Sequence, residues 1–168
     1  MNIVAFDLSL TSTGVCHPDG STSTIISKKR GVERLDELEK AVRYLVIDAN
    51  ASRVVLEGYS FASRGRASVS LGELGGVVRL SLWRIDASYT EIPPSCRAKY
   101  ATGSGSAKKT LAVQQAALRA ERAFPNDDEA DAWLMWQMAL AHYAPDDPRL
   151  VRVPGKNRLG LDGVDWAQ

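Results

Sequence analysis

Two short runs of strand-forming residues each end in a carboxylate, and this limits how the chain can fold. Ile3–Phe6 leads directly into Asp7, and the run Val54–Leu56 leads into Glu57. The stretch between them contains apolar residues at helical spacing, which are Leu35, Leu38, Val42, Leu45 and Val46. If the two strands are parallel neighbours, both acids lie at one edge of a sheet, where such folds place their chemistry. Paired, half-buried carboxylates repel each other, and a cation relieves that repulsion.

The remaining periodicity predicts one α/β domain with a mixed sheet of about five strands and helices on both faces. The strands are expected at 2–6, 13–17, 22–27, 54–57 and 88–92, and the helices at 35–46, 68–86, 94–100, 107–122 and 128–143. Residues 1–144 would form the whole domain. Residues 145–168 lack periodicity and are interpreted as a tail that either contacts DNA or is loosely ordered.

Composition indicates a soluble globular protein of one domain. The chain has 168 residues, of which 45% are hydrophobic and 24% charged, and no apolar stretch is long enough to span a membrane. Cys16 and Cys96 lack CxxC spacing, and His17 and His142 stand alone. These residues argue against a zinc site and favour a reduced, cytoplasmic setting.

A second acidic group lies at the start of the helix expected at 128–143. Asp128 and Asp131 are three residues apart and therefore share a helix face near Ala132 and Trp133. Together with Asp7 and Glu57 they provide four oxygen ligands, which suit Mg²⁺ or Mn²⁺ better than zinc. Asp127 and Glu129 are interpreted as acids that only complement the helix dipole or cap the helix.

Basic residues gather in two segments although the net charge is only +1. The DNA-binding candidates among them are Arg64 and Arg66 in the first segment and Arg97, Lys99, Lys108 and Lys109 in the second. Solvated surface charge is the alternative explanation for each segment.

The helix expected at 68–86 has two apolar stripes. One contains Leu71, Leu74, Val78, Leu82 and Ile85, and the other contains Val77, Leu80 and Trp83. One stripe can face the sheet and the other a second copy of the chain, which predicts a homodimer. A helix buried on both sides within one subunit is the alternative.

These motifs together resemble the RuvC-type Holliday junction resolvases of the ribonuclease H-like superfamily. Asp7 in VAFDLSLTSTG and Glu57 in VVLEGYSF resemble the acids that end the family's first and fourth strands, and DEADAWLMW resembles its closing D-x-x-D-A pattern. SLGELGGVV resembles the helix after the glutamate, and residues 93–114 resemble the basic segment, with Lys99 and Lys109 in the places of its functional lysines. The family's base-stacking aromatic corresponds to Tyr59 or Phe61.

One departure is that Leu8-Ser9 follows the first aspartate where cellular members usually have Pro-Gly, a form closer to bacteriophage-encoded members. The expected location is the bacterial cytoplasm, including that of an infected host. Branch-migration partners are left open.

The resemblance implies a DNA endonuclease that resolves four-way junctions by paired symmetric nicks and leaves 5′-phosphates. Two Mg²⁺ ions per site, replaceable by Mn²⁺, would be held by Asp7, Glu57, Asp128 and Asp131 and would activate water and stabilise the leaving oxygen. Lys109 would neutralise the scissile phosphate. Branched DNA is the expected partner, and no membrane is expected.

Two alternatives use some of the same residues. A ribonuclease H-like nuclease acting on other branched DNA, flaps or hybrids needs the same four acids. A nucleotide-binding protein of the sugar kinase and actin-like class is suggested by Thr11, Thr13 and Gly14 after Asp7. That class duplicates its fold, for which 168 residues do not suffice.

Overall fold

The computed structural model describes residues 1–58 and 66–166, with the backbone alone for residues 66–68. Its strands are β1 (Ile3–Asp7), β2 (Ser12–Cys16), β3 (Thr22–Ile26), β4 (Arg53–Glu57) and β5 (Tyr89–Ile92). Its helices are α1 (Gly31–Asp48), α2 (Arg66–Arg84), α3 (Pro94–Thr102), α4 (Lys109–Ala120), α5 (Asp127–Tyr143) and α6 (Gly155–Arg158).

The five strands form one mixed sheet in the order β3-β2-β1-β4-β5. β1 pairs with β2 and β2 with β3 in antiparallel fashion, whereas β1–β4 and β4–β5 are parallel. The predicted fold class is therefore confirmed, including the parallel pairing of the two strands that end in Asp7 and Glu57.

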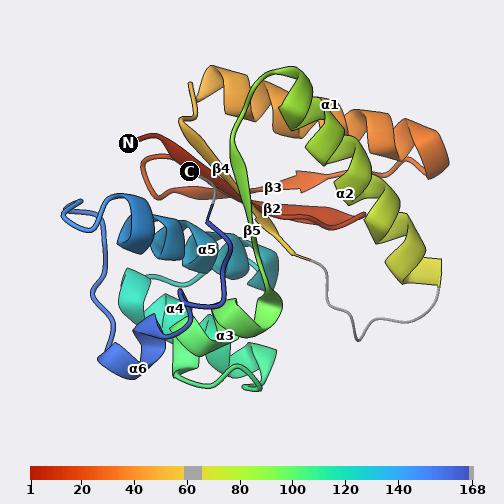
Figure 1. The fold of residues 1–168 in the computed structure, drawn as a ribbon. Coiled ribbons are helices and arrows are strands. Elements are labelled where there is room, and N and C mark those ends of the chain that lie inside the picture. Colours follow the sequence, from red (N-terminus) through yellow and green to blue (C-terminus); the bar gives the residue numbers. More distant parts are fainter. Residues whose placement is uncertain (59–65, 167–168) are drawn as a thin grey trace.

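Alternating side chains of the strands supply two separate cores, one on each face of the sheet. Val4 and Phe6 of β1 pack with α1 and α2 on one face, and Ile3 and Ala5 pack against α5 on the other. Figure 1 shows α1 and α2 together above the sheet and the other helices gathered below it. Because every residue of β1 is buried, an acid at its end is held away from bulk water.

The two apolar stripes of α2 face different surroundings. Leu74, Val78 and Leu82 are fully buried against the sheet, whereas Leu80 and Trp83 are 47% and 71% exposed. The structure therefore rejects the alternative in which one subunit buries both stripes. The outer stripe borders a groove of about 530 Å³ between α1 and α2, which is lined by residues that include Val32, Val77 and Leu80.

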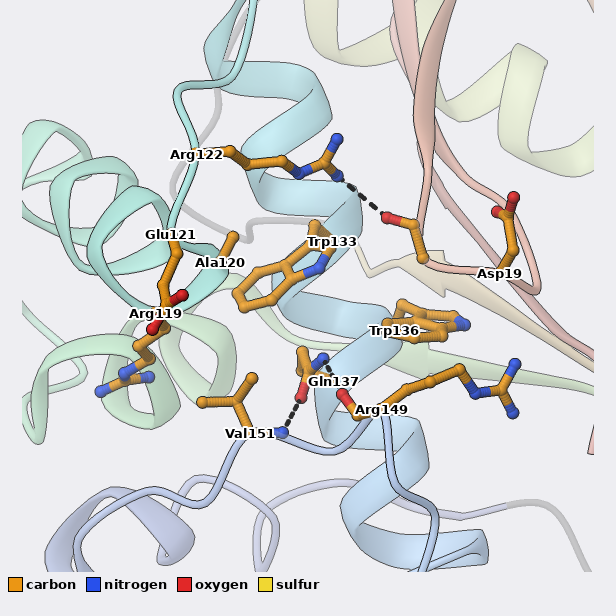
Figure 2. Close-up of a pocket in the computed structure, with 11 residues that line it drawn as sticks. Asp19, Arg119, Ala120, Glu121, Arg122, Trp133, Trp136, Gln137, Arg149 and Val151 are labelled. Carbon is orange, nitrogen blue, oxygen red and sulfur yellow. Dashed lines mark hydrogen bonds between the residues drawn. The ribbon is translucent and has the colours of Figure 1, made fainter.

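The C-terminal segment packs against the helices below the sheet. Gln137 of α5 donates to the Arg149 carbonyl at 3.0 Å and accepts from the Val151 N–H at 2.8 Å (Figure 2). Asn157 is buried and donates to the Tyr100 carbonyl of α3 at 2.9 Å. Through residue 166 the segment is thus packed and not loosely ordered, and a role in DNA contact stays a prediction.

None of the helices within residues 1–58 and 66–166 is long and apolar enough to cross a bilayer.

Candidate active site

The two strand-ending acids meet at one edge of the sheet, as their parallel pairing requires. Asp7 is the last residue of β1 and is 5% exposed, and Glu57 is the last residue of the neighbouring β4. Burial raises the pKa of Asp7 well above its usual range, and the adjacent Glu57 carboxylate raises it further. The charge of Arg97 opposes this rise without cancelling it.

Asp131 joins these acids from the N-terminal part of α5. Its side chain is fully buried, and neither carboxylate oxygen has a hydrogen-bond partner among the described residues. Burial raises the pKa of Asp131 to about 6, against the opposing charges of Arg97 and Lys109. Oδ2 lies within ion-pair distance of two cations, whereas Oδ1 has no partner among the described residues. A buried carboxylate oxygen without a partner costs stability, so this position favours a cation ligand over a purely structural role.

Gly14 explains how α5 comes so close to β1. Gly14 lies opposite Asp7 in the β1–β2 register, and a Cβ at this position would lie 2.1 Å from the Asp128 carbonyl oxygen. Only glycine allows the α5 backbone to lie against β2 at this distance. The glycine of the TSTG motif thus brings the Asp128–Asp131 turn to the acid that ends the first strand.

Arg97 of α3, predicted to contact DNA, lies inside the acidic cluster. It is 8% exposed, with Nη1 2.5 Å from Glu57 Oε1 and Nη2 3.1 Å from Asp131 Oδ2. It shares a helix face with the buried Tyr100 and Ala101. A guanidinium held between two carboxylates in this way is poorly placed for a backbone phosphate, and the predicted DNA contact stays a prediction.

Lys109, at the start of α4, is the second cation of the cluster. Its Nζ lies 2.8 Å from Asp127 Oδ2, 3.3 Å from Asp131 Oδ2 and 3.8 Å from Asp128 Oδ1. Partial burial opposes its charge, but the hydrogen bond to Asp127 and the nearby aspartates raise the pKa of Lys109. Its side chain is 48% exposed, so it stays charged at the border between the acids and solvent.

The cluster has the chemistry of a divalent cation site, with its carboxylates arranged around protein cations. Within the described ranges, no group of three or more His, Cys, Asp or Glu side chains already converges on a point that a metal ion would fill. The unpartnered Oδ1 of Asp131 and the crowding of Asp7 by Glu57 nevertheless fit an oxygen-ligated ion such as Mg²⁺.

The other predicted DNA-binding residues lie apart from the acids or outside the described part of the chain. Lys108 is the exposed residue just before α4, and Lys99 is half-buried on α3, with no ion pair among those found in the described ranges. Tyr59, Phe61 and Arg64 lie outside the described residues, and only the backbone of Arg66 is described, at the start of α2. Their roles stay predictions.

The acids interpreted as helix-start charges do more than complement the dipole. Asn126 caps α5 by accepting from the Glu129 N–H at 2.9 Å. Glu129 itself is 4% exposed and accepts from the Thr24 hydroxyl of β3 at 2.6 Å, while Asp127 pairs with Lys109. Both residues lie in the first turn of α5, and Glu129 also accepts from the Asn126 side chain at 3.4 Å, so the capping interpretation holds; in addition, the two side chains link α5 to β3 and to the start of α4.

The hairpin after Asp7 is closed by hydrogen bonds between its own residues, which argues against a phosphate-binding role. The Thr13 hydroxyl donates to the Ser9 carbonyl at 2.9 Å and accepts from the Ser9 N–H at 3.1 Å. Gly14 is covered by the Asp128 backbone. Thr13 and Gly14 therefore leave no exposed cradle for a nucleotide.

Comparisons with known proteins show the fold. No family model matches the chain, and no curated protein matches it. Among solved structures it is similar to Thermus thermophilus RuvC, with 15% identity, a TM-score of 0.66, and 80% of this chain and 90% of that one covered. The T. thermophilus RuvC complex with a Holliday junction substrate gives 13% identity, a TM-score of 0.68 and coverage of 86% and 96%.

The yeast mitochondrial Holliday junction resolvase is also similar, with 13% identity, a TM-score of 0.54 and coverage of 84% of this chain and 80% of that one. This chain thus has the fold of these proteins at low sequence identity. The three structures lend no support to the bacteriophage-like origin expected from Leu8-Ser9.

Proposed function

We propose that this chain is a divalent-metal-dependent DNA endonuclease that resolves four-way junctions by paired symmetric nicks. The observation that carries the proposal is the meeting of Asp7, Glu57 and Asp131 from three separate elements, with Asp131 fully buried and its Oδ1 without a hydrogen bond or ion pair among the described residues. A structural cluster would not need three mutually repelling acids at the end of the sheet.

Asp7, Glu57, Asp128 and Asp131 would hold two Mg²⁺ ions in the substrate complex, and Mn²⁺ would substitute. When bound, these ions lower the pKa of a water nucleophile and stabilise the leaving oxygen. Asp7 would be the central ligand, because it ends β1 beside Glu57 and lies opposite Gly14, against which the α5 turn packs. Lys109 would contact the scissile phosphate and neutralise its charge. Water would attack the phosphorus, the bond to the 3′-oxygen would break, and the phosphate would stay on the 5′-oxygen.

The substrate class is proposed from two independent features. One of the similar structures is a Holliday junction resolvase, and another is T. thermophilus RuvC in complex with a Holliday junction substrate. In addition, this chain exposes an apolar stripe of α2 with Leu80 and Trp83, which suits a symmetric dimer. A junction has approximate two-fold symmetry, so paired nicks need two such sites in one particle.

A nuclease acting on flaps, hybrids or other branched DNA remains the competing function, since it uses the same acids. It differs in needing one active site per substrate and no symmetric dimer.

Amide substitution of the strand-ending acids tests the proposed chemistry. Asp7→Asn or Glu57→Gln should lower the rate of Mg²⁺-dependent junction cleavage by at least about 100-fold, because each removes a ligand used in the transition state. Junction binding in Ca²⁺, measured by gel shift, should stay within about threefold of the unmodified protein. Cleavage by Asp7→Asn at the unmodified rate would rule out this site.

A further inference from the structure

Arg97 occupies the space between two of the proposed metal ligands. Its guanidinium pairs with Glu57 at 2.5 Å and with Asp131 at 3.1 Å, and it is almost fully buried. Arg97 Nε and Nη1 do not reach hydrogen-bond geometry with any described group, so the contact is held by charge more than by well-aligned hydrogen bonds. Arg97 is therefore held as a counter-ion, and the Glu57 and Asp131 carboxylates can still take other ligands.

The packing of α3 against the C-terminal segment fixes Arg97 in this position. It shares the buried face of α3 with Tyr100, whose carbonyl accepts from Asn157 at 2.9 Å. Gly160 lies against the same helix, because a Cβ there would be 2.6 Å from the Cys96 carbonyl oxygen. A guanidinium is charged at every working pH, so α3 carries a permanent positive charge into the cluster.

The charges of the cluster then leave room for one divalent ion. Counted as formal charges, the five carboxylates and two cations of the cluster sum to −3; the acids are Asp7, Glu57, Asp127, Asp128 and Asp131, and the cations are Arg97 and Lys109. Within the described ranges, Asp7 alone of these five acids has no ion pair. One divalent ion at Asp7 brings the cluster to −1, whereas a second would make it positive and would meet the charge of Arg97.

We propose that Arg97 takes the place of one metal ion in the DNA-free protein, so that the free chain binds a single divalent ion tightly. The second ion then joins only when the scissile phosphate brings further negative charge. This inference rests on the proposed function, since it concerns the same metal site, and it makes Arg97 a positioning residue. It would keep the free enzyme from assembling a complete two-ion site before substrate arrives.

Counting Mn²⁺ ions on the DNA-free protein tests the inference without measuring activity. Free Mn²⁺ is followed by electron paramagnetic resonance during titration of the unmodified chain, of Arg97→Met, which keeps the volume and removes the charge, and of Arg97→Lys. The unmodified chain and Arg97→Lys should bind one ion, with any second ion at least about tenfold weaker. Arg97→Met should bind two ions, and saturating Mg²⁺ should raise its melting temperature more than that of the unmodified chain.

Arg149→Met is the matched control. Arg149 pairs with Asp147 at 2.5 Å away from the acidic cluster, so this variant should melt lower while still binding one ion. Two equally tight ions on the unmodified DNA-free chain, or an unchanged count in Arg97→Met, would overturn the inference. If Arg97→Met does not fold, the count on the unmodified chain decides.

The outcomes also separate this inference from the proposed function. A chain that binds two ions without DNA and cuts junctions refutes the role of Arg97 and leaves the nuclease assignment intact. A chain that binds no divalent ion and cuts no DNA refutes both.

Discussion

Replacing Gly14 by alanine should disable the site without touching a carboxylate. The added Cβ would lie 2.1 Å from the Asp128 carbonyl oxygen, 2.3 Å from its carbon and 2.9 Å from the Glu129 nitrogen. All three are backbone atoms, so no side-chain rotation relieves the clash. β2 and the start of α5 must separate by roughly 1 Å, because carbon and oxygen need about 3 Å or more between them.

This displacement falls on the element that carries Asp128 and Asp131, whereas Asp7 and Glu57 stay on the sheet. A shift of about 1 Å in catalytic groups typically costs about 100-fold in rate, so we expect a loss of that order in cleavage. Overpacking should also lower the free energy of unfolding by about 1–3 kcal/mol. Single-turnover cleavage of a labelled junction and urea unfolding measure the two effects.

Gly155→Ala provides the control, because nothing lies within 4 Å of a Cβ at that position. It makes the same chemical change at the start of α6 and should leave the cleavage rate and stability nearly unchanged. A Gly14→Ala protein that cuts at the unmodified rate with unmodified stability would refute the argument that this glycine sets the distance between α5 and β1.

Three further outcomes are expected. Lys108→Ala should weaken junction binding and reduce the slope of log affinity against log salt by about one unit, and an unchanged slope places Lys108 off the DNA. Leu80→Asp should leave a folded monomer, since Leu80 is half exposed in the single chain. The same change should abolish a dimer measured by sedimentation, and an unaffected dimer would place the interface elsewhere. The hydrogen bond from Arg149 lowers the pKa of Asp147 to about 2. The ionised Asp147 therefore adds about 1 kcal/mol, after solvent screening, to the free energy of unfolding above about pH 4, and this contribution is lost toward pH 2. The stability difference between the unmodified chain and Asp147→Asn should shrink over that range, and a constant difference would contradict this.

The sequence was sufficient to predict where the acids meet. Asp7 and Glu57 follow strands whose order along the chain, with one helix between, favours parallel neighbours, and β1 and β4 do pair in parallel. The expected bounds of the strands agree with the structure to within one or two residues, because buried strands and amphipathic helices differ clearly in period.

The role of Arg97 could not be predicted in the same way. A basic residue between Cys96 and Ala98 has the same local pattern whether its helix faces solvent or the sheet edge. The choice depends on contacts from residues 60 positions away, such as the Asn157 side chain that holds Tyr100. The aperiodic C-terminal segment was underestimated for the same reason, since its packing rests on single polar contacts and a close glycine approach and not on a repeating pattern.

Cleavage of a supercoiled plasmid that extrudes a cruciform tests the central claim most directly. The purified chain is added with Mg²⁺, and nicked and linear products are separated over time. A junction resolvase with two coordinated sites should convert the plasmid to linear form at the cruciform with little nicked intermediate, and Asp7→Asn should produce neither form. Accumulation of nicked circles alone, or equal cutting of a plasmid without the cruciform, would contradict the account.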